Sequence, residues 1–320
     1  MNTLQRVNIN KAVWSTKKLF RHKLKADIAR NKYIYLMAVP VMVYYIIFCY
    51  FPLYGIIISF NNYSPRLGIL GSTWVGFKWF KEFFNSYYFW RLIKNTFLIS
   101  SYDILWGFPA PIILALLLNE IRSNFFKRTI QTITYLPYFM SLVVVCGIII
   151  DFTATNGVIN DIITWIGGER SNLLGNFKLF RSIYIGSGIW QGVGWGSIIY
   201  LASLSGIDPT LYEASVIDGA NRWKQLLHIT IPGILPTIII LFILRIGSIM
   251  GVGYEKIILL YNQQTYETAD VISTFVYRKG LLESNYSYST AIGLFNSIIN
   301  FMFLIFANKL SDKLTDTSLW

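Results

Sequence analysis

The sequence predicts an all-α, polytopic membrane protein in which six helices cross the bilayer. Of its 320 residues, 54% are hydrophobic, 17% are aromatic and only 14% are charged, which is too apolar for an ordinary soluble domain. The apolar residues are gathered in runs near the ~20 residues that a helix needs to cross about 30 Å of hydrocarbon. Tyr and Trp cluster near most ends of these runs, as an interfacial belt requires. The predicted spans are about 34–60, 95–118, 130–150, 183–204, 237–260 and 288–307.

The distribution of Lys and Arg predicts the orientation of the chain. Residues 1–33 contain nine of these basic residues and a single acid, Asp27. By the positive-inside rule this end stays in the cytoplasm, and six spans return the C-terminus to the same side. The link 119–128 and the insert 206–236 then face the cytoplasm. The stretches expected to face outward are 61–92, 152–181 and 261–285.

We therefore expect a multi-pass protein of the cell membrane with three parts. A basic cytoplasmic tail (1–33) precedes a transmembrane domain (34–308), and a short cytoplasmic tail (309–320) follows it. No cleavable signal peptide is expected, because the basic leader runs straight into the first span. Cytoplasmic anchoring and anionic lipid headgroups account for the net charge of +12, so this charge does not indicate nucleic-acid binding.

The sequence shows no pattern typical of a catalytic or metal site. It contains no Gly-Lys dipeptide and hence no phosphate-binding P-loop, and its two histidines, His22 and His228, lie far apart. Both cysteines fall inside predicted spans, where neither a disulfide nor a metal is expected. Asp103 and Asp151 are more simply explained as pore-facing or interfacial polar groups. The chain is thus predicted to be non-catalytic, and uphill transport would draw its energy from another subunit or from an ion gradient.

The insert 206–236 is a polar, helix-forming segment between two apolar runs. Asp208 can cap free backbone N–H groups, and Pro209 suits the first helical position, so a helix is predicted to run to Asp218. Gly219 then permits a backbone angle that other residues resist, and the chain can turn there.

A second helix is expected over about 220–229. Pro232 and Pro236 are expected to break it at the membrane. The two helices and their turn would form a helix–turn–helix knob in the cytoplasm, which is suited to being held by another protein.

The spacing of this knob resembles the EAA loop of binding-protein-dependent ABC importers. That pattern is Glu-Ala-Ala, three residues, Gly, nine residues, and then Ile-x-Leu-Pro. Here it reads Glu213-Ala214-Ser215, Gly219 and Ile229-Thr230-Ile231-Pro232, and every spacing is met. The alternative interpretation is an ordinary surface turn with an ordinary surface acid, which would suffice for a shorter match.

The resemblance implies that the knob is a coupling helix that fits a cleft on an ATPase subunit. Glu213 would make charge-assisted contacts to the ATPase, and Gly219 would present the helix. Ala214 and Ser215 would be small because the helix enters a groove. Contacts at the rim are expected from Asp218 and Arg222.

Short phrases in a common order run along nearly the whole chain. They are Lys32–Leu36, Phe51–Gly55, Asn95-Thr96, Leu114–Glu120, Tyr135–Ser141 and Gln191–Trp195. Together with the EAA-like loop they resemble the permeases of carbohydrate importers, in the LplB/YteP-like branch of the maltose-type group. The resemblance implies an ABC importer type I permease fold, a second permease subunit in a heterodimer, two copies of an ATPase, an extracellular solute-binding protein and an oligosaccharide substrate. It also implies no cofactor in this chain, because ATP and Mg are bound by the partner ATPase.

Other classes of protein stay open at this point. An ion-coupled secondary transporter would show paired repeats or midplane acids, yet no repeat is evident and only Asp103 could reach that depth. A membrane-embedded enzyme would need a cluster of acids at one membrane face, which the sequence lacks. An ABC permease for a non-sugar solute, such as a peptide or amino acid, is the nearest rival.

The span 183–204 is the candidate sugar path, because aromatic faces stack on sugar rings and polar groups match hydroxyls. Gly188, Gly192 and Trp195 are three or four residues apart and so share one helical face. The other candidate contacts on this span are Trp190 and Gln191. Glycine-rich faces with Trp also form tight helix–helix contacts in membranes, and that alternative stays open.

Arg245 is the sharpest indication of substrate chemistry. It follows Pro236 by nine residues, roughly 13 Å along a helix, which places it well inside the bilayer. A charge at that depth should face the bundle interior or a water-filled cavity. Arg245 could offer a bidentate fork to the carboxylate of an acidic, uronate-containing oligosaccharide. The competing interpretation is an internal ion pair with Glu255, Asp103 or a partner subunit.

Overall fold

The computed structural model describes residues 27, 30–315 and 318–319, so nearly all of the basic tail predicted over 1–33 lies outside the described residues. The chain divides into two compact units, Met1–Ile57 and Ile58–Trp320. The first unit contains α2 (Lys32–Tyr45) and the π-helical turn η1 (Ile46–Tyr50), and the 3₁₀ segment η2 (Phe51–Phe60) crosses the boundary. No residue of α2 is buried by protein, as is expected of an apolar helix that contacts lipid.

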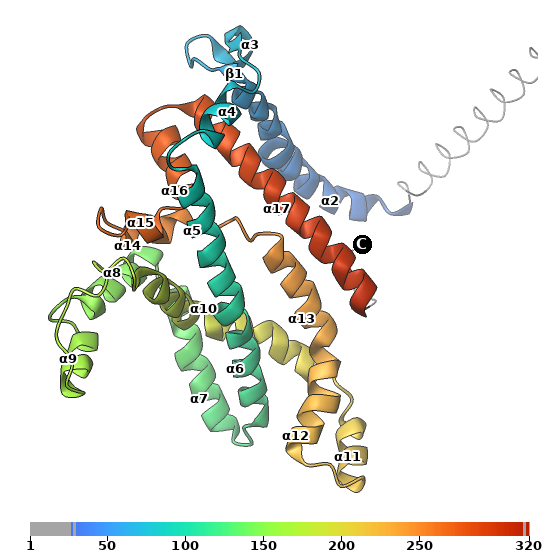
Figure 1. Ribbon diagram of the computed structural model, residues 1–320. Coiled ribbons are helices and arrows are strands. Elements are labelled where there is room, and N and C mark those ends of the chain that lie inside the picture. The colour runs from blue at the N-terminus through green and yellow to red at the C-terminus, as the bar shows by residue number, and fades with distance from the viewer. Residues whose placement is uncertain (1–26, 28–29, 316–317, 320) are drawn as a thin grey trace, which may run out of the picture. The chain divides into compact units, whose positions relative to one another are not determined.

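The second unit is almost entirely helical (Figure 1). Its one sheet is a short antiparallel pair in which Asn61 faces Trp74 and Asn62 faces Thr73. The strands are β1 (Asn61–Asn62) and β2 (Thr73–Trp74). The helices are α3 (Gly68–Gly71), α4 (Lys78–Phe84), α5 (Phe89–Tyr102), α6 (Pro109–Glu120), α7 (Asn124–Tyr135), α8 (Leu142–Thr153), α9 (Val158–Trp165), α10 (Phe180–Ser205), α11 (Pro209–Ile217), α12 (Arg222–Gln225), α13 (Ile231–Ile246), α14 (Tyr254–Leu260), α15 (Tyr266–Ala269), α16 (Ile272–Tyr277) and α17 (Tyr286–Thr315). The tighter or wider turns are η3 (Asp103–Gly107), η4 (Leu136–Phe139), η5 (Leu226–Thr230) and η6 (Arg278–Leu282).

Within the described residues, five stretches are long and apolar enough to cross a membrane. They are Lys32–Phe60, Phe89–Glu120, Leu142–Trp165, Arg222–Ile246 and Tyr286–Lys313. Helix α10, at 26 residues, has the length to span but carries more polar residues. The protein is thus a multi-pass, all-helical membrane protein, while the count of six spans and the sidedness of the termini stay predictions.

Two predicted spans are broken in the structure, so their continuous form was wrong. The predicted span 130–150 is divided where η4 ends and Ser141 caps α8, its hydroxyl accepting from the Val144 N–H at 3.3 Å. The predicted span 237–260 is divided between α13 and α14. There two side chains of α17 form hydrogen bonds to the backbone of Met250. Its N–H donates to Asn300 at 2.8 Å, and its carbonyl accepts from Asn296 at 3.1 Å. Irregular backbone is tolerated at membrane depth where protein satisfies its polar groups in this way.

The predicted break at Pro232 and Pro236 does not occur. Segments α12, η5 and α13 follow one another directly, and Pro232 lies in the first turn of α13 with Pro236 inside the helix. The wide turn η5 comes just before the first proline, and the Ile231 N–H bonds there to the Leu226 carbonyl. The helix therefore continues through both prolines, and its backbone adjusts locally to the N–H groups that the prolines lack.

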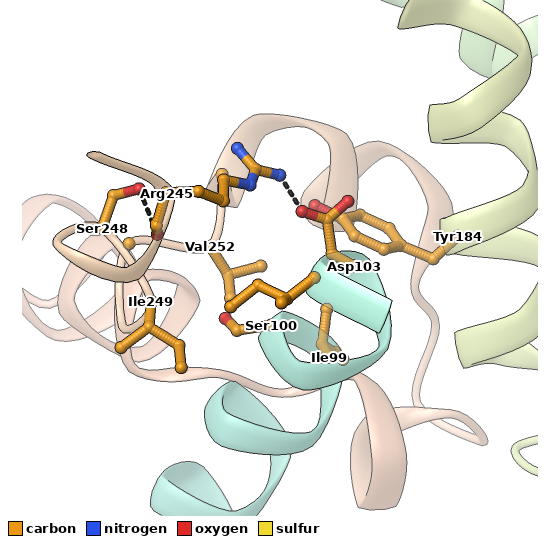
Figure 2. A pocket seen from close by; sticks show the side chains of 11 residues that line it. Ile99, Ser100, Asp103, Tyr184, Arg245, Ser248, Ile249 and Val252 are labelled. Atoms are coloured by element: carbon orange, nitrogen blue, oxygen red, sulfur yellow. Dashed lines mark hydrogen bonds and ion pairs between the residues drawn. The ribbon is translucent and has the colours of Figure 1, made fainter. Parts of the chain in front are cut away.

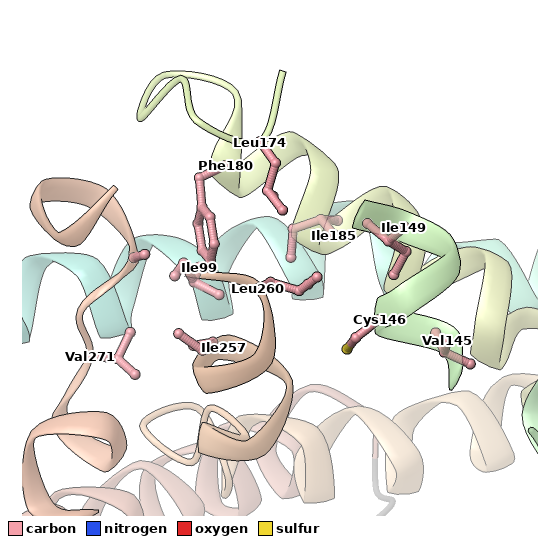
Figure 3. Close-up of a cluster of buried hydrophobic side chains, with 11 residues drawn as sticks. Ile99, Val145, Cys146, Ile149, Leu174, Phe180, Ile185, Ile257, Leu260 and Val271 are labelled. Atoms are coloured by element: carbon pink, nitrogen blue, oxygen red, sulfur yellow. The ribbon is translucent and has the colours of Figure 1, made fainter. Parts of the chain in front are cut away.

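The main core of the second unit is built from α5, α8, α10, α14 and the segment 269–271, which precedes α16 (Figure 3). Ile99, Cys146, Phe180 and Ile257 are almost completely buried there. A second cluster joins α4, the start of α5, α16 and α17 through residues such as Phe83 and Phe275, and a third joins α6, α10 and α13. The helix Phe89–Glu120 contributes to all three clusters and so runs through the centre of the unit.

Asp270 connects α5 to the segment around α16 through its side chain and its backbone carbonyl. Its side chain is 0% exposed and accepts hydrogen bonds from Arg278 at 2.8 Å, Arg91 at 3.2 Å and Thr274 at 2.8 Å. Asn95 of α5 donates to the Asp270 carbonyl at 3.0 Å. A buried carboxylate is stable only with such partners, so this network ties α5 to the segment around α16.

Candidate functional site

Two cavities lie between α5, α10 and α13 and meet at the same charged side chains. The large cavity, of about 500 Å³, is lined by η3, α6, α10 and α13. The small cavity, of about 130 Å³, is lined by α5, Tyr184 of α10 and the irregular segment after α13 (Figure 2). Asp103, Arg245 and Ser248 line both cavities.

Arg245 and Asp103 form an ion pair at this junction (Figure 2). The Arg245 side chain is 51% exposed and that of Asp103 is 27% exposed, so both reach the cavity space. Of the partners proposed for Arg245, the structure brings together Asp103, while Glu255 is exposed on α14. The guanidinium thus faces a polar cavity, as expected for a charge at this depth, and it has an internal counter-ion there.

A local departure from α-helical geometry positions Asp103. Asp103 is the first residue of the π-helical turn η3, and Gly107 is the last. A Cβ atom added to Gly107 would lie 2.7 Å from Asp103 Oδ1, so a larger residue would displace the carboxylate. Such π-turns are rare and are frequent at functional sites. The sequence suggested Asp103 as a polar lining group and as one of several partners for Arg245, but no sequence pattern predicts the π-turn that positions it.

The glycines of α10 divide between the two roles that the sequence left open. Gly188 and Gly192 line the large cavity, and nothing lies within 4 Å of a Cβ added to Gly192. A Cβ added to Gly194 would collide with the Thr134 backbone of α7, which indicates tight helix packing. One face of α10 therefore borders the cavity while the adjacent face packs against α7.

The aromatic and amide candidates of α10 do not line the cavity beside Arg245. Trp195 stacks on Tyr138 of η4, with ring centroids 4.7 Å apart and an interplanar angle of 4°. Trp190 lines a separate apolar pocket together with residues of α8 and α9. Gln191 is half-buried and lines none of these pockets. Of the three residues expected on one face, Gly188 and Gly192 therefore line the cavity and Trp195 does not. Most of the other residues of α10 that line the cavity lie on the side of Gly192 away from Trp195.

The EAA-like segment forms the predicted helix and turn. In α11 the Asp208 side chain accepts from the Thr210 N–H at 2.9 Å, and this hydrogen bond holds the pKa of Asp208 below its ordinary value. The cap is therefore charged at neutral pH, where it also complements the positive end of the helix. Gly219 follows with φ 73°, the left-handed region that favours glycine, and so makes the turn.

Side-chain hydrogen bonds fasten α11 to the helix that follows the turn. Gln225 donates to the Ser215 hydroxyl at 3.0 Å, and the hydroxyls of Tyr212 and Thr230 lie 3.0 Å apart. Ser215 is thus small and also bonded across the turn, a role that its place in the motif did not reveal. These contacts join α11 to the helix after the turn, and both helices lie at the same end of the second unit as the link between α6 and α7 (Figure 1).

The outer surface of α11 and α12 is exposed and carries both charge and apolar groups. Glu213, Ala214 and Asp218 are exposed, and in the described part of the chain the Glu213 carboxylate has no hydrogen bond or ion pair. The exposed apolar side chains beside them were not predicted, and Ile217 is 87% exposed. They are Leu211, Val216, Ile217 and Trp223.

Arg222, predicted as a contact to the ATPase, forms an ion pair within this chain. Its guanidinium lies 2.5 Å from a carboxylate oxygen of Glu120, the last residue of α6. Both side chains are more than half exposed. The structure thus links the EAA-like segment to the end of the helix Phe89–Glu120 whose middle carries Asp103.

Comparison with known proteins identifies the family. Residues 107–316 match the family of binding-protein-dependent transport system inner membrane components. The chain belongs to this family. This permease is 43% identical over 296 residues to protein LplB of Bacillus subtilis (strain 168), covering 92% of this chain and 93% of LplB. It is 42% identical over 305 residues to the polygalacturonan/rhamnogalacturonan transport system permease protein YteP of the same organism, covering 95% of each chain.

Solved structures agree with this assignment. A crystal structure of a bacterial ABC transporter involved in the import of the acidic polysaccharide alginate contains a chain 43% identical to this permease, with a TM-score of 0.84. The match covers 92% of this chain and 99% of that chain. A second structure of the alginate transporter, in complex with an alginate pentasaccharide-bound periplasmic protein, matches equally well. The predicted membership of the LplB/YteP-like branch is confirmed, and the chain is a non-catalytic permease whose ATPase is a separate subunit.

Proposed function

We propose that this permease is the subunit through which a sugar ABC importer moves an acidic, uronate-containing oligosaccharide. The observation that carries the proposal is the half-exposed Arg245 guanidinium at the junction of the two cavities. A guanidinium presents paired N–H donors in the geometry of a carboxylate. Hydroxyl groups alone do not require a full positive charge at membrane depth, where such a charge is costly.

The relatives support an acidic substrate. YteP is named for polygalacturonan and rhamnogalacturonan, and the solved transporter imports alginate, which is acidic. These polymers carry carboxylates on their sugar rings, so a guanidinium in the path suits all of them. We further propose that a second permease subunit completes the path, that two ATPase copies bind ATP and Mg, and that an extracellular binding protein delivers the sugar.

The coupling loop supplies the remaining element of the proposal. Glu213 and Asp218 offer charges for the ATPase, and the four exposed apolar side chains around them offer area to bury. Ala214 and Ser215 keep the helix narrow, and the Gly219 turn presents it. An exposed apolar patch rimmed by charge is typical of a protein docking surface.

Replacing Arg245 with Gln tests the acidic substrate. Uptake of a uronate oligosaccharide by the complete importer in proteoliposomes is expected to fall about tenfold or more, since hydrogen bonds to charged groups contribute about 1.5–3 kcal/mol. Uptake of a neutral oligosaccharide of equal length should stay within about twofold, and Arg245→Lys should keep part of the preference because it offers a point charge without the fork.

Two further variants complete this experiment. The double variant Asp103→Asn/Arg245→Gln removes both charges together, so it shows whether an unpaired Asp103 causes the loss. Glu255→Gln, at an exposed acid of α14, is the matched control. Equal loss of acidic and neutral uptake in Arg245→Gln would show that the pair is purely structural and would contradict the acidic substrate.

Exchanging the charges of Glu120 and Arg222 tests whether their ion pair takes part in coupling. Each single reversal is expected to lower the sugar-stimulated ATPase rate a few-fold, because an exposed pair contributes at most about 1 kcal/mol and reversal adds repulsion. The double exchange Glu120→Arg/Arg222→Glu should restore the rate. If Arg222 instead contacts the ATPase, as the motif implies, the double exchange will stay as impaired as Arg222→Glu alone.

A further inference from the structure

The partly exposed Asp103–Arg245 pair differs from the ion pairs of the buried Asp270. Asp270 is 0% exposed and has two arginines and a threonine as partners. Asp103 is 27% exposed, and among the described residues its carboxylate has a single partner, Arg245. A pair that water reaches is weakly held, whereas a fully buried network is not.

Both charged groups of this pair stand where a solute would lie. Asp103, Arg245 and Ser248 line the small cavity (Figure 2), and they line the large cavity as well. A solute that passes from one cavity to the other therefore meets the pair. While one of its amino groups is bonded to Asp103, the guanidinium has fewer free N–H donors to offer a solute, and its charge is already partly neutralised.

The backbone is arranged to hold the carboxylate there. Asp103 opens the π-turn η3, and the missing side chain of Gly107 leaves the space that Oδ1 occupies. A side chain at position 107 would push the carboxylate out of this place.

We propose that Asp103 tunes the affinity of Arg245 for the substrate by acting as an internal substitute for the substrate carboxylate. It neutralises Arg245 in the empty cavity, and an incoming uronate displaces it by forming the same type of charge-assisted hydrogen bond. A neutral sugar offers no carboxylate and leaves the pair intact. Because one carboxylate replaces another, the uronate binds weakly enough to be released, and Asp103 sets that affinity while Arg245 supplies the preference for an acidic sugar.

This inference rests on the proposed acidic substrate, and its test separates the two. The measurement is equilibrium binding of a labelled uronate pentasaccharide and of a neutral glucan pentasaccharide to the complete importer in nanodiscs, without binding protein. Asp103→Asn is expected to lower the Kd for the uronate about two- to fivefold, the range that corresponds to an exposed ion pair. The Kd for the glucan should not change.

Two variants keep the test decisive. Gly107→Ala retains the carboxylate but displaces it from Arg245, so it should shift the uronate Kd in the same direction, and it carries the test if the Asp103→Asn complex does not assemble. Glu255→Gln should leave both Kd values unchanged. A weaker uronate affinity in Asp103→Asn, or an equal shift for both sugars, would overturn the inference and make Asp103 a support for Arg245.

Failure of the proposed function looks different. In that case the native importer would bind both sugars equally, and Arg245→Gln would change neither Kd. If the native importer prefers the uronate and Arg245→Gln loses that preference while Asp103→Asn and Gly107→Ala leave the uronate Kd unchanged, only the role of Asp103 is wrong.

Discussion

Replacing Glu213 with Ala is expected to lower the stimulation of ATP hydrolysis by sugar-loaded binding protein about tenfold or more, since a hydrogen bond to a charged group contributes about 1.5–3 kcal/mol. The carboxylate is exposed on α11, and no partner within the described chain occupies it. It is therefore available to a basic group of the ATPase. The measurement is the ATPase rate of the purified importer in lipid, with and without loaded binding protein.

A matched control separates docking from general damage. Asp312 is an exposed acid on α17, outside the EAA-like segment, and Asp312→Ala should leave the stimulation unchanged. The Glu213→Ala permease should still fold, because the residue has no internal contact to lose. Full stimulation in Glu213→Ala would contradict its coupling role, and failure of any ATPase to co-purify with the native chain would contradict the coupling loop itself.

The first helix and the turn of the EAA-like segment could be predicted from sequence because their features are local. The Asp208-Pro209 start and the Gly219 turn depend on backbone geometry within a few residues, and both occur as expected. The contacts that join the two helices were not predictable. A second helix containing Gln225 was expected, but the packing of the two helices across the turn, which brings Gln225 to Ser215, depends on their side chains and is not shown by the sequence.

The approximate length and the apolar character of the membrane spans could be predicted from sequence. The positions at which a span is interrupted could not. Apolar runs report the cost of lipid contact, and they do not show where protein replaces lipid around an irregular segment. The break after Ile246 depends on Asn296 and Asn300 of α17, which lie some fifty residues away along the chain. Ser141 before α8 was a usable local sign, since Ser is a favoured helix cap.

The cavity was only partly predictable for the same reason. The depth of Arg245 followed from counting residues along a helix, and its need for a polar surrounding followed from the cost of a buried charge. The choice of Asp103 over Glu255 depends on the π-turn η3 and on the position of this turn in the wall of the large cavity, which α13 also lines. Likewise, helical spacing grouped Trp195 with Gly188, but Tyr138 and α7 determine which face of α10 is covered.

Asp270→Asn is expected to destabilise the permease by about 3–5 kcal/mol, the range for removing one partner of a buried ion pair. The change leaves the guanidinium groups of Arg91 and Arg278 close together without their shared counter-ion. It also loosens the connection between α5 and the segment around α16. Thermal unfolding of the purified permease, followed by intrinsic tryptophan fluorescence, should show a clearly lower Tm.

The control for this variant is an exposed ion pair of the same region. Glu283 accepts from Lys279 at 2.7 Å across one helical turn, and its side chain is half-exposed. Glu283→Gln should change the free energy of unfolding by no more than about 0.5 kcal/mol, as is typical of exposed pairs four residues apart. Equal Tm values for the two variants would mean that the Asp270 network is not held together by charge. A large loss in Asp270→Asn alone would instead support the view that this network anchors α5, the helix that leads directly into Asp103.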